Sequence, residues 1–176
     1  MIEGADLVGK STLIREIKRR RPEIIPIKFD RVPVDLRTDE TYGEIMRYAD
    51  NMVYKIISQI KDKVFVMDRF IVSELIYSNF LKRKPCETIA DILNKKLRVI
   101  ILTAKESVII ERAKQRNEDL FKTSEILKLN KLFYNFYNKN YSKIKYLYCY
   151  ENNCESDLFS ITTIINKMIR YDGPKN

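Results

Sequence analysis

The segment from Gly4 to Ser11 constrains the fold of this chain more than any other part of its sequence. It reads Gly-Ala-Asp-Leu-Val-Gly-Lys-Ser and matches the pattern G-x-x-x-x-G-K-[S/T] without a mismatch. The two glycines let the backbone turn tightly, so that successive N–H groups point at one centre, and a helix starting near Lys10 adds its positive end. Such a loop cradles phosphate groups, with Lys10 as a point charge for the β- and γ-phosphates and Ser11 as a hydroxyl for Mg²⁺.

The loop is predicted to bind ATP·Mg²⁺ through a contiguous run of residues, namely Gly4, Ala5, Asp6, Leu7, Val8, Gly9, Lys10, Ser11 and Thr12. An amphipathic helix follows the loop directly, which is the context that the pattern requires. Only Met1, Ile2 and Glu3 precede it. The strand that should lead into the loop is therefore very short, or the chain starts upstream.

The rest of the chain alternates between short apolar runs and segments with helical periodicity. Strands are predicted, after the short first one, at Ile24–Phe29, Val64–Met67, Arg98–Leu102 and Lys145–Tyr150. Helices are predicted at Ser11–Arg21, Glu40–Lys61, Ile71–Leu81, Glu87–Leu93, Glu106–Gln115, Thr123–Tyr141 and Asp157–Ile169. This alternation predicts an α/β fold with a parallel five-stranded sheet and helices on both faces.

Composition limits the classes of function. The 176 residues fit one domain, and no apolar run approaches the length of a membrane span. No signal peptide is visible, so we expect a cytoplasmic protein. The chain lacks histidine, which leaves carboxylates, Lys, Arg, backbone amides or a metal for catalysis, and its odd count of three cysteines argues against a disulfide framework. The net charge of +9 fits either a phosphate-bearing partner or a simple enrichment in lysine.

A second motif combines a buried strand with charged residues. Val64 to Met67 are apolar and are followed by Asp68 and Arg69. In a parallel sheet these side chains would emerge at the carboxyl edge, where ligands bind. Asp68 could hold a Mg²⁺-bound water and Arg69 could take a phosphate bidentately. The alternative is an Asp that caps the next helix beside a solvated arginine.

Two further features are less specific. Arg112 and Arg116 stand four residues apart, on one face of a predicted helix, and could clamp phosphates or form a surface ladder with nearby glutamates. Aromatic residues at helical spacing favour core packing over a base-stacking surface. They are Phe133, Tyr134, Phe136, Tyr137 and Tyr141.

With these motifs the chain resembles the thymidylate kinase branch of the nucleoside monophosphate kinases. The segment Glu3–Thr12 is similar to the phosphate-binding loop of that family, and Asp68–Tyr77 is similar to its Asp-Arg-Tyr…Ser…Tyr block, especially in small phage-type deoxynucleotide kinases. The resemblance implies a three-layer α/β/α P-loop kinase fold, with residues 1–176 as one domain and a short lid around 112–122. It also implies ATP-dependent phosphorylation of a (deoxy)nucleoside monophosphate, with dTMP as the favoured acceptor.

The resemblance also assigns roles to individual residues. Lys10, Asp68, Arg112 and Arg116 would be catalytic, and Ser11 and Asp68 would serve the metal. The acceptor would be held by Asp6, Phe29, Arg31, Arg69 and Tyr77. The chain departs from the family at Leu7, where one subgroup has an arginine, and at Tyr48–Asn51, where the family often has an arginine for the acceptor.

Two other readings stay open on the sequence alone. A deoxynucleoside kinase would share the fold and the loop, but its acceptor carries no phosphate and needs a carboxylate as general base. A non-catalytic nucleic-acid-binding protein would use the basic surface and bind in a salt-dependent way. We expect small nucleotides as partners, rather than nucleic acid or a membrane, and leave a homodimer open.

Overall fold

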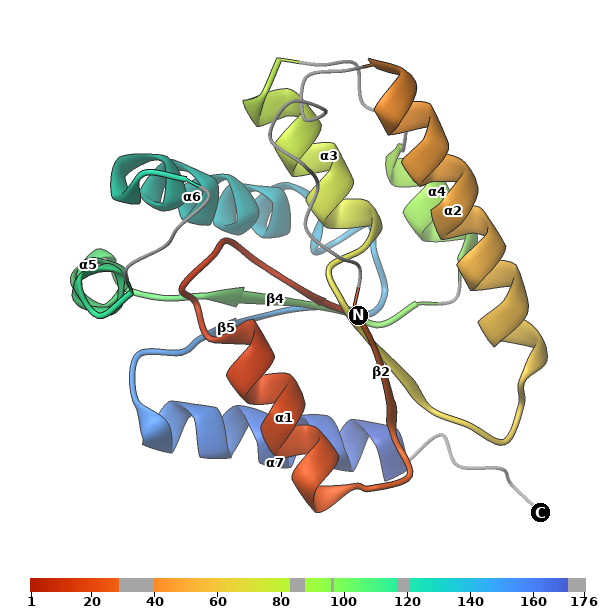
Figure 1. Ribbon diagram of the computed structural model, residues 1–176. Coiled ribbons are helices and arrows are strands. Elements are labelled where there is room, and N and C mark those ends of the chain that lie inside the picture. Colours follow the sequence, from red (N-terminus) through yellow and green to blue (C-terminus); the bar gives the residue numbers. More distant parts are fainter. Residues whose placement is uncertain (29–39, 83–87, 96, 117–120, 171–176) are drawn as a thin grey trace.

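Five parallel strands form one sheet in the order β2-β3-β1-β4-β5 (Figure 1). The computed structural model describes residues 1–28, 40–82, 88–95, 97–116 and 121–170. The strands are β1 (Ile2–Glu3), β2 (Ile25–Lys28), β3 (Phe65–Asp68), β4 (Val99–Thr103) and β5 (Leu147–Glu151). The helices are α1 (Lys10–Arg20), α2 (Glu40–Gln59), α3 (Ile71–Phe80), α4 (Ile89–Asn94), α5 (Glu106–Lys114), α6 (Thr123–Asn140) and α7 (Glu155–Arg170).

Helices cover both faces of the sheet. Figure 1 shows α1 and α7 on one side and α3 and α6 on the other, with α2 at the outer margin of the molecule. The predicted α/β fold with a parallel five-stranded sheet and three α/β/α layers is confirmed. The hydrophobic core lies between the sheet and its helices. Every residue of β4 is buried, and Leu13, Leu129 and Phe133 belong to the same core from the helices.

The central strand β1 is only two residues long, yet it pairs with β3 on one side and β4 on the other. The N–H of Ile100 donates to Met1 O at 2.9 Å, and that of Arg69 donates to Ile2 O at 3.0 Å. The amino terminus donates to Arg98 O at 2.6 Å. The hydrogen bonds just outside β1 supply pairing that its two residues alone lack.

Helix α1 starts directly at Lys10 and ends at a basic run. Leu13 and Ile17 face the core, whereas Lys18, Arg19 and Arg20 fill the last turn, where positive charge suits the helix dipole. Lys18 Nζ also donates to the carbonyls of Pro22 and Ile24, at 2.5 and 2.7 Å. The basic run therefore serves as a helix terminus in this structure.

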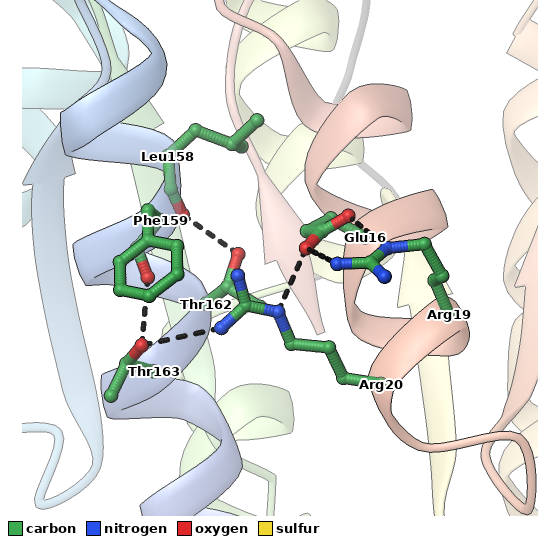
Figure 2. A network of polar contacts seen from close by, with 7 residues as sticks. All are labelled: Glu16, Arg19, Arg20, Leu158, Phe159, Thr162 and Thr163. Atoms are coloured by element: carbon green, nitrogen blue, oxygen red, sulfur yellow. Dashed lines mark hydrogen bonds and ion pairs between the residues drawn. The ribbon is translucent and has the colours of Figure 1, made fainter.

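The polar contacts between α1 and α7 are drawn in Figure 2. Arg20 Nε donates to Glu16 Oε1 at 2.7 Å and its Nη1 to Thr163 Oγ1 at 3.4 Å, while its guanidinium lies 4.4 Å from the centroid of the Phe159 ring. Glu16 also accepts two bonds of 2.8 Å from Arg19. These bonds lower the pKa of Glu16 to about 2.

The aromatic residues of α6 divide between core and surface. Phe133 is fully buried and Phe136 and Tyr137 are half-buried, as predicted for core positions. Tyr134 and the following Tyr141 are 50% and 60% exposed, so the prediction of core positions is wrong for these two residues. None of the described helices combines the length and apolar character needed to cross a bilayer.

Candidate active site

The loop between β1 and α1 has the backbone shape that its sequence predicts. Gly4 and Gly9 have positive φ values of 146° and 91°, and Leu7 has a φ of 65°. A Cβ atom at Gly4 would collide with the carbonyl oxygen of Leu102 on β4, so only glycine fits there. Gly9 leads straight into α1, where Leu13 N donates to Gly9 O at 3.0 Å. The loop therefore lies at the positive end of α1, where backbone N–H groups favour an anion.

Lys10 is buried within this loop. Its Nζ donates to Ala5 O at 2.5 Å, so the ammonium is folded back over the loop backbone. Burial lowers the pKa of Lys10 to about 7, and the nearby positive charge of Arg69 acts in the same direction. Asp6 and Asp68 oppose this shift. A phosphate beside Lys10 would favour the charged form and raise the pKa again.

Ser11 and Asp68 meet at the carboxyl end of β3. Ser11 Oγ donates to Asp68 Oδ2 at 3.3 Å, across 57 residues of sequence. The motif on β3 and the phosphate-binding loop are thus brought together, as the sequence predicts. Asp68 is buried, whereas Ser11 is exposed.

Arg69 links the loop to α3. Its Nη2 donates to Asp6 Oδ1 at 2.5 Å, and its guanidinium lies 5.0 Å from the centroid of the Tyr77 ring. Arg69 has a positive φ of 68°, a conformation that costs about 1 kcal/mol in a residue with a side chain. The bond from its N–H to Ile2 O holds this conformation. Asp6, Arg69 and Tyr77, all predicted to bind the acceptor, therefore form one cluster.

Glu3 belongs to the site but was not predicted from the sequence. It is fully buried, and it accepts hydrogen bonds from Ser73 N at 3.2 Å and Ser73 Oγ at 2.5 Å. Burial raises the pKa of Glu3 to about 7, and the Ser73 hydroxyl works against that shift. These hydrogen bonds connect Glu3 on β1 with Ser73 in the first turn of α3, the helix that contains Tyr77. The sequence signal that could have identified Glu3 is a charged residue in a strand that is expected to be buried.

Arg112 contacts the outer side of the loop. Its Nη1 donates to Leu7 O at 2.9 Å and its Nη2 to Asn152 O at 3.2 Å. Asn152 Nδ2 donates to Val8 O at 2.9 Å. Two side chains thus hold loop carbonyls from outside, and Asn152 was missed by the sequence analysis, although it directly follows the last strand.

The two arginines of the predicted lid differ in the structure. Arg112 binds the loop backbone, whereas Arg116 is exposed just beyond the end of α5. Residues 117–120 of the predicted lid lie outside the described residues, as do the predicted acceptor residues Phe29 and Arg31. The described part of the site therefore gathers Lys10, Ser11 and Asp68 with the Asp6–Arg69–Tyr77 cluster, at the carboxyl ends of β1 and β3.

The donor set at this edge fits Mg²⁺ better than zinc. Mg²⁺ prefers oxygen ligands and keeps several waters, so one hydroxyl and one carboxylate beside phosphates suit it. Ser11 Oγ and the Asp68 carboxylate provide such a pair. Within the described ranges no group of three or more His, Cys, Asp or Glu side chains could hold a metal by itself.

The glycine-rich loop follows the central strand of the β2-β3-β1-β4-β5 sheet and leads directly into α1. No protein-family model and no curated protein matches the chain. Solved structures of similar fold include deoxyadenosine kinase from M. mycoides with dCMP and dCDP, at 21% identity over 94% of this chain and 97% of that one, with a TM-score of 0.59.

Two further structures share this fold. The YorR protein from Bacillus subtilis, in complex with phosphorylated GDP, has a TM-score of 0.65 at 21% identity and covers 96% of this chain and 94% of its own. A gluconokinase from Sinorhizobium meliloti has a TM-score of 0.55 at 14% identity, with 98% and 95% covered. At these identities the similarity shows a common three-layer α/β/α fold.

Proposed function

We propose that this protein is an ATP-dependent kinase that phosphorylates a deoxynucleoside monophosphate, with dTMP as the first acceptor to test. The observation that carries the proposal is the position of Arg69. Its guanidinium lies beside the loop that suits the donor phosphates, paired with Asp6 and stacked on Tyr77. An arginine held in this way can turn its planar fork toward the phosphate of an acceptor.

In the proposed reaction the chain acts by positioning and by charge. The loop N–H groups and Lys10 hold the β- and γ-phosphates of ATP, and Arg69 holds the acceptor phosphate in line with the γ-phosphate. Asp6 steadies Arg69 and faces the acceptor. Ser11 and Asp68 would hold Mg²⁺, which when bound neutralises charge on the phosphates. Arg116 is proposed to close over the transferring group, which would exclude water from it.

A deoxynucleoside kinase is the second candidate, and one observation favours it. Arg69 already has a carboxylate partner in Asp6, so its charge is balanced within the chain. A nucleoside acceptor would bring a hydroxyl instead of a phosphate to this pair, and a carboxylate would take the proton of that hydroxyl. The similar structures include a deoxyadenosine kinase, which adds support to this alternative.

A panel of acceptors distinguishes the two candidates. Nucleosides and their monophosphates, four bases each, are incubated with the full chain and ATP·Mg²⁺, and products are identified by mass spectrometry. The proposal expects nucleoside diphosphates from at least one monophosphate and little product from the nucleosides. Efficient conversion of a nucleoside to its monophosphate, with poor use of that monophosphate, would establish the second candidate instead.

A further inference from the structure

Two successive carbonyl groups of the glycine-rich loop are held from outside, by side chains that come from two different elements. Leu7 O accepts a hydrogen bond of 2.9 Å from Arg112 in the last turn of α5. Val8 O accepts a bond of 2.9 Å from Asn152 Nδ2, directly after β5. Arg112 Nη2 also donates to Asn152 O at 3.2 Å, which connects the two contacts. Arg112 and Asn152 thus fix the outer side of the loop together.

The two held carbonyls determine where the following N–H groups point. The peptide bonds of the described loop are trans, and in a trans peptide the C=O and N–H groups point in opposite directions. Because the Leu7 carbonyl points to Arg112, the N–H of Val8 points away from it. Because the Val8 carbonyl points to Asn152, the N–H of Gly9 points inward as well. Among the described residues, neither of these two N–H groups donates to an acceptor of the chain.

Asn152 packs directly against the end of the loop. Its side chain is only 3% exposed, and a Cβ atom at Gly9 would collide with its Nδ2. Gly9 also has a positive φ of 91°, which a residue with a side chain rarely adopts. The second glycine of the loop is therefore required both by the backbone conformation and by the close approach of Asn152.

The stability of the fold does not by itself account for an asparagine at position 152. Its Nδ2 bonds the loop, but its Oδ1 is buried and has no hydrogen-bond partner in the part of the chain that the structure describes. A buried acceptor without a partner costs about as much stability as one hydrogen bond contributes. A leucine of similar size would remove both the bond and the unpartnered oxygen. The amide is therefore best explained by what its N–H bond does to the loop.

We propose that Asn152 is a positioning residue for the donor phosphates, because it holds the Val8 carbonyl outward and so aims the N–H of Gly9 at a phosphate oxygen. Arg112 does the same for the N–H of Val8. This inference rests on the proposed function, since it takes the loop as the site of the donor triphosphate. Bonds from N–H groups to phosphate are charge-assisted, and groups that already point at the anion need no reorganisation when it binds. Asn152 acts through the loop backbone, without a contact of its own to the nucleotide.

Titration calorimetry of the full chain with Mg²⁺-tripolyphosphate tests the inference, because this probe has the phosphates of ATP but neither base nor sugar. Asn152→Leu should weaken its binding by roughly ten- to thirtyfold, since the N–H of Gly9 loses its fixed direction. The Tm should stay within a few degrees of the parent value. The matched control is Asn153→Leu, because the Asn153 side chain bonds Lys105 N and Glu151 at 2.8 and 2.9 Å rather than the loop. This control should bind the probe as the parent does.

Amide NMR at saturating probe gives a readout that a merely structural role would not change. In the parent, the amide proton resonances of Val8 and Gly9 should both move downfield as their N–H groups bond phosphate. In Asn152→Leu the Gly9 shift should be much smaller while the Val8 shift is kept, and Arg112→Ala should show the reverse. Asn152→Asp has the same size and also lacks the donor, so it replaces Asn152→Leu if circular dichroism shows that the leucine variant is unfolded.

The outcomes separate this inference from the proposed function. A parent that binds the probe, with Asn152→Leu binding it equally well, would overturn the inference and leave the donor site in place. Equal losses of the Val8 and Gly9 shifts in Asn152→Leu would overturn it as well, and so would a lower Tm with unchanged affinity. A parent that does not bind the probe would overturn the donor site, and with it both the proposed function and this inference.

Discussion

The donor side and the acceptor side of the site are built in different ways. The donor side is one contiguous loop, Gly4–Thr12, whose shape follows from its own glycines and from the helix that it starts. The acceptor side brings together Asp6, Arg69 and Tyr77, and the first two are 63 residues apart. A change in the loop outside Asp6 should therefore affect turnover with every acceptor alike, whereas a change at Arg69 or Tyr77 should affect only the use of the acceptor.

The largest expected effect is on the donor side. Lys10→Ala removes the positive charge from the transferring phosphate, and kcat should fall by about three orders of magnitude or more. The fall should be the same for every acceptor that the parent uses, while circular dichroism shows an intact fold. Near-normal turnover with any acceptor would disprove the assignment of the loop.

The protonation of Lys10 gives the next effect. Burial lowers its pKa to about 7, so the ammonium form is depleted as the pH rises above that value. Phosphate binding needs the charged form, and the affinity for ATP should fall by roughly tenfold per pH unit above 7. Titration calorimetry in buffers of different ionisation heat should show proton uptake on ATP binding at pH 8. Acceptor affinity should not follow this profile, and a shared pH dependence would erase the contrast between the two sides.

Arg112 and Arg116, at the end of α5, are expected to affect different kinetic constants. Arg112 holds the carbonyl of Leu7 in the loop, so Arg112→Ala should raise the KM for ATP several-fold. Arg116 is exposed, and the proposed closure brings it to the phosphates only during transfer. Arg116→Ala should therefore lower kcat by roughly tenfold with little change in KM. Steady-state kinetics with ATP varied at saturating acceptor separates the two, and a pure KM effect for Arg116 would assign it to ground-state binding.

The smallest expected effect concerns Glu16, which lies outside both the donor side and the acceptor side of the site. Bonds from Arg19 and Arg20 lower the pKa of Glu16 from its ordinary value to about 2. A lowered carboxylate pKa stabilises the folded chain above the ordinary pKa, and this contribution is lost as the pH falls toward 2. Glu16→Gln should flatten the decline of Tm between about pH 4.5 and 2, with kinetics at neutral pH unchanged. Altered kinetics would mean that the α1–α7 contact affects the site.

The sequence was informative where local patterns decide the structure. The strand β4 follows from its apolar run, and the loop follows from the spacing of Gly4, Gly9 and Lys10. Long-range partners were not predictable. The spacing of Arg112 and Arg116 placed both on one helix face, yet Arg112 binds the carbonyl of Leu7, 105 residues away. Such contacts depend on how the sheet brings strand ends together, which no local pattern encodes.

Helix α2 shows a second limit of the sequence. Its apolar residues have helical periodicity, which predicts one helix over Glu40–Lys61. The structure divides them between a core side with Val53 and Ile57 and an exposed side with Met52 and Ile56. In each of the pairs Met52–Val53 and Ile56–Ile57, one residue faces the core and its neighbour is exposed. Helical periodicity in the sequence is therefore the same for a helix with one apolar side and for a helix with two.

The most direct test of the central claim is Arg69→Lys, with both substrates varied. Lysine keeps the positive charge but lacks the planar fork, so a bidentate contact with an acceptor phosphate is lost. The account predicts that kcat/KM for the accepted monophosphate falls by roughly ten- to a hundredfold, in line with ~1.5–3 kcal/mol for a charge-assisted bond, while the KM for ATP barely changes. An equal loss for ATP, or no loss for the monophosphate, would contradict the claim that Arg69 holds the acceptor.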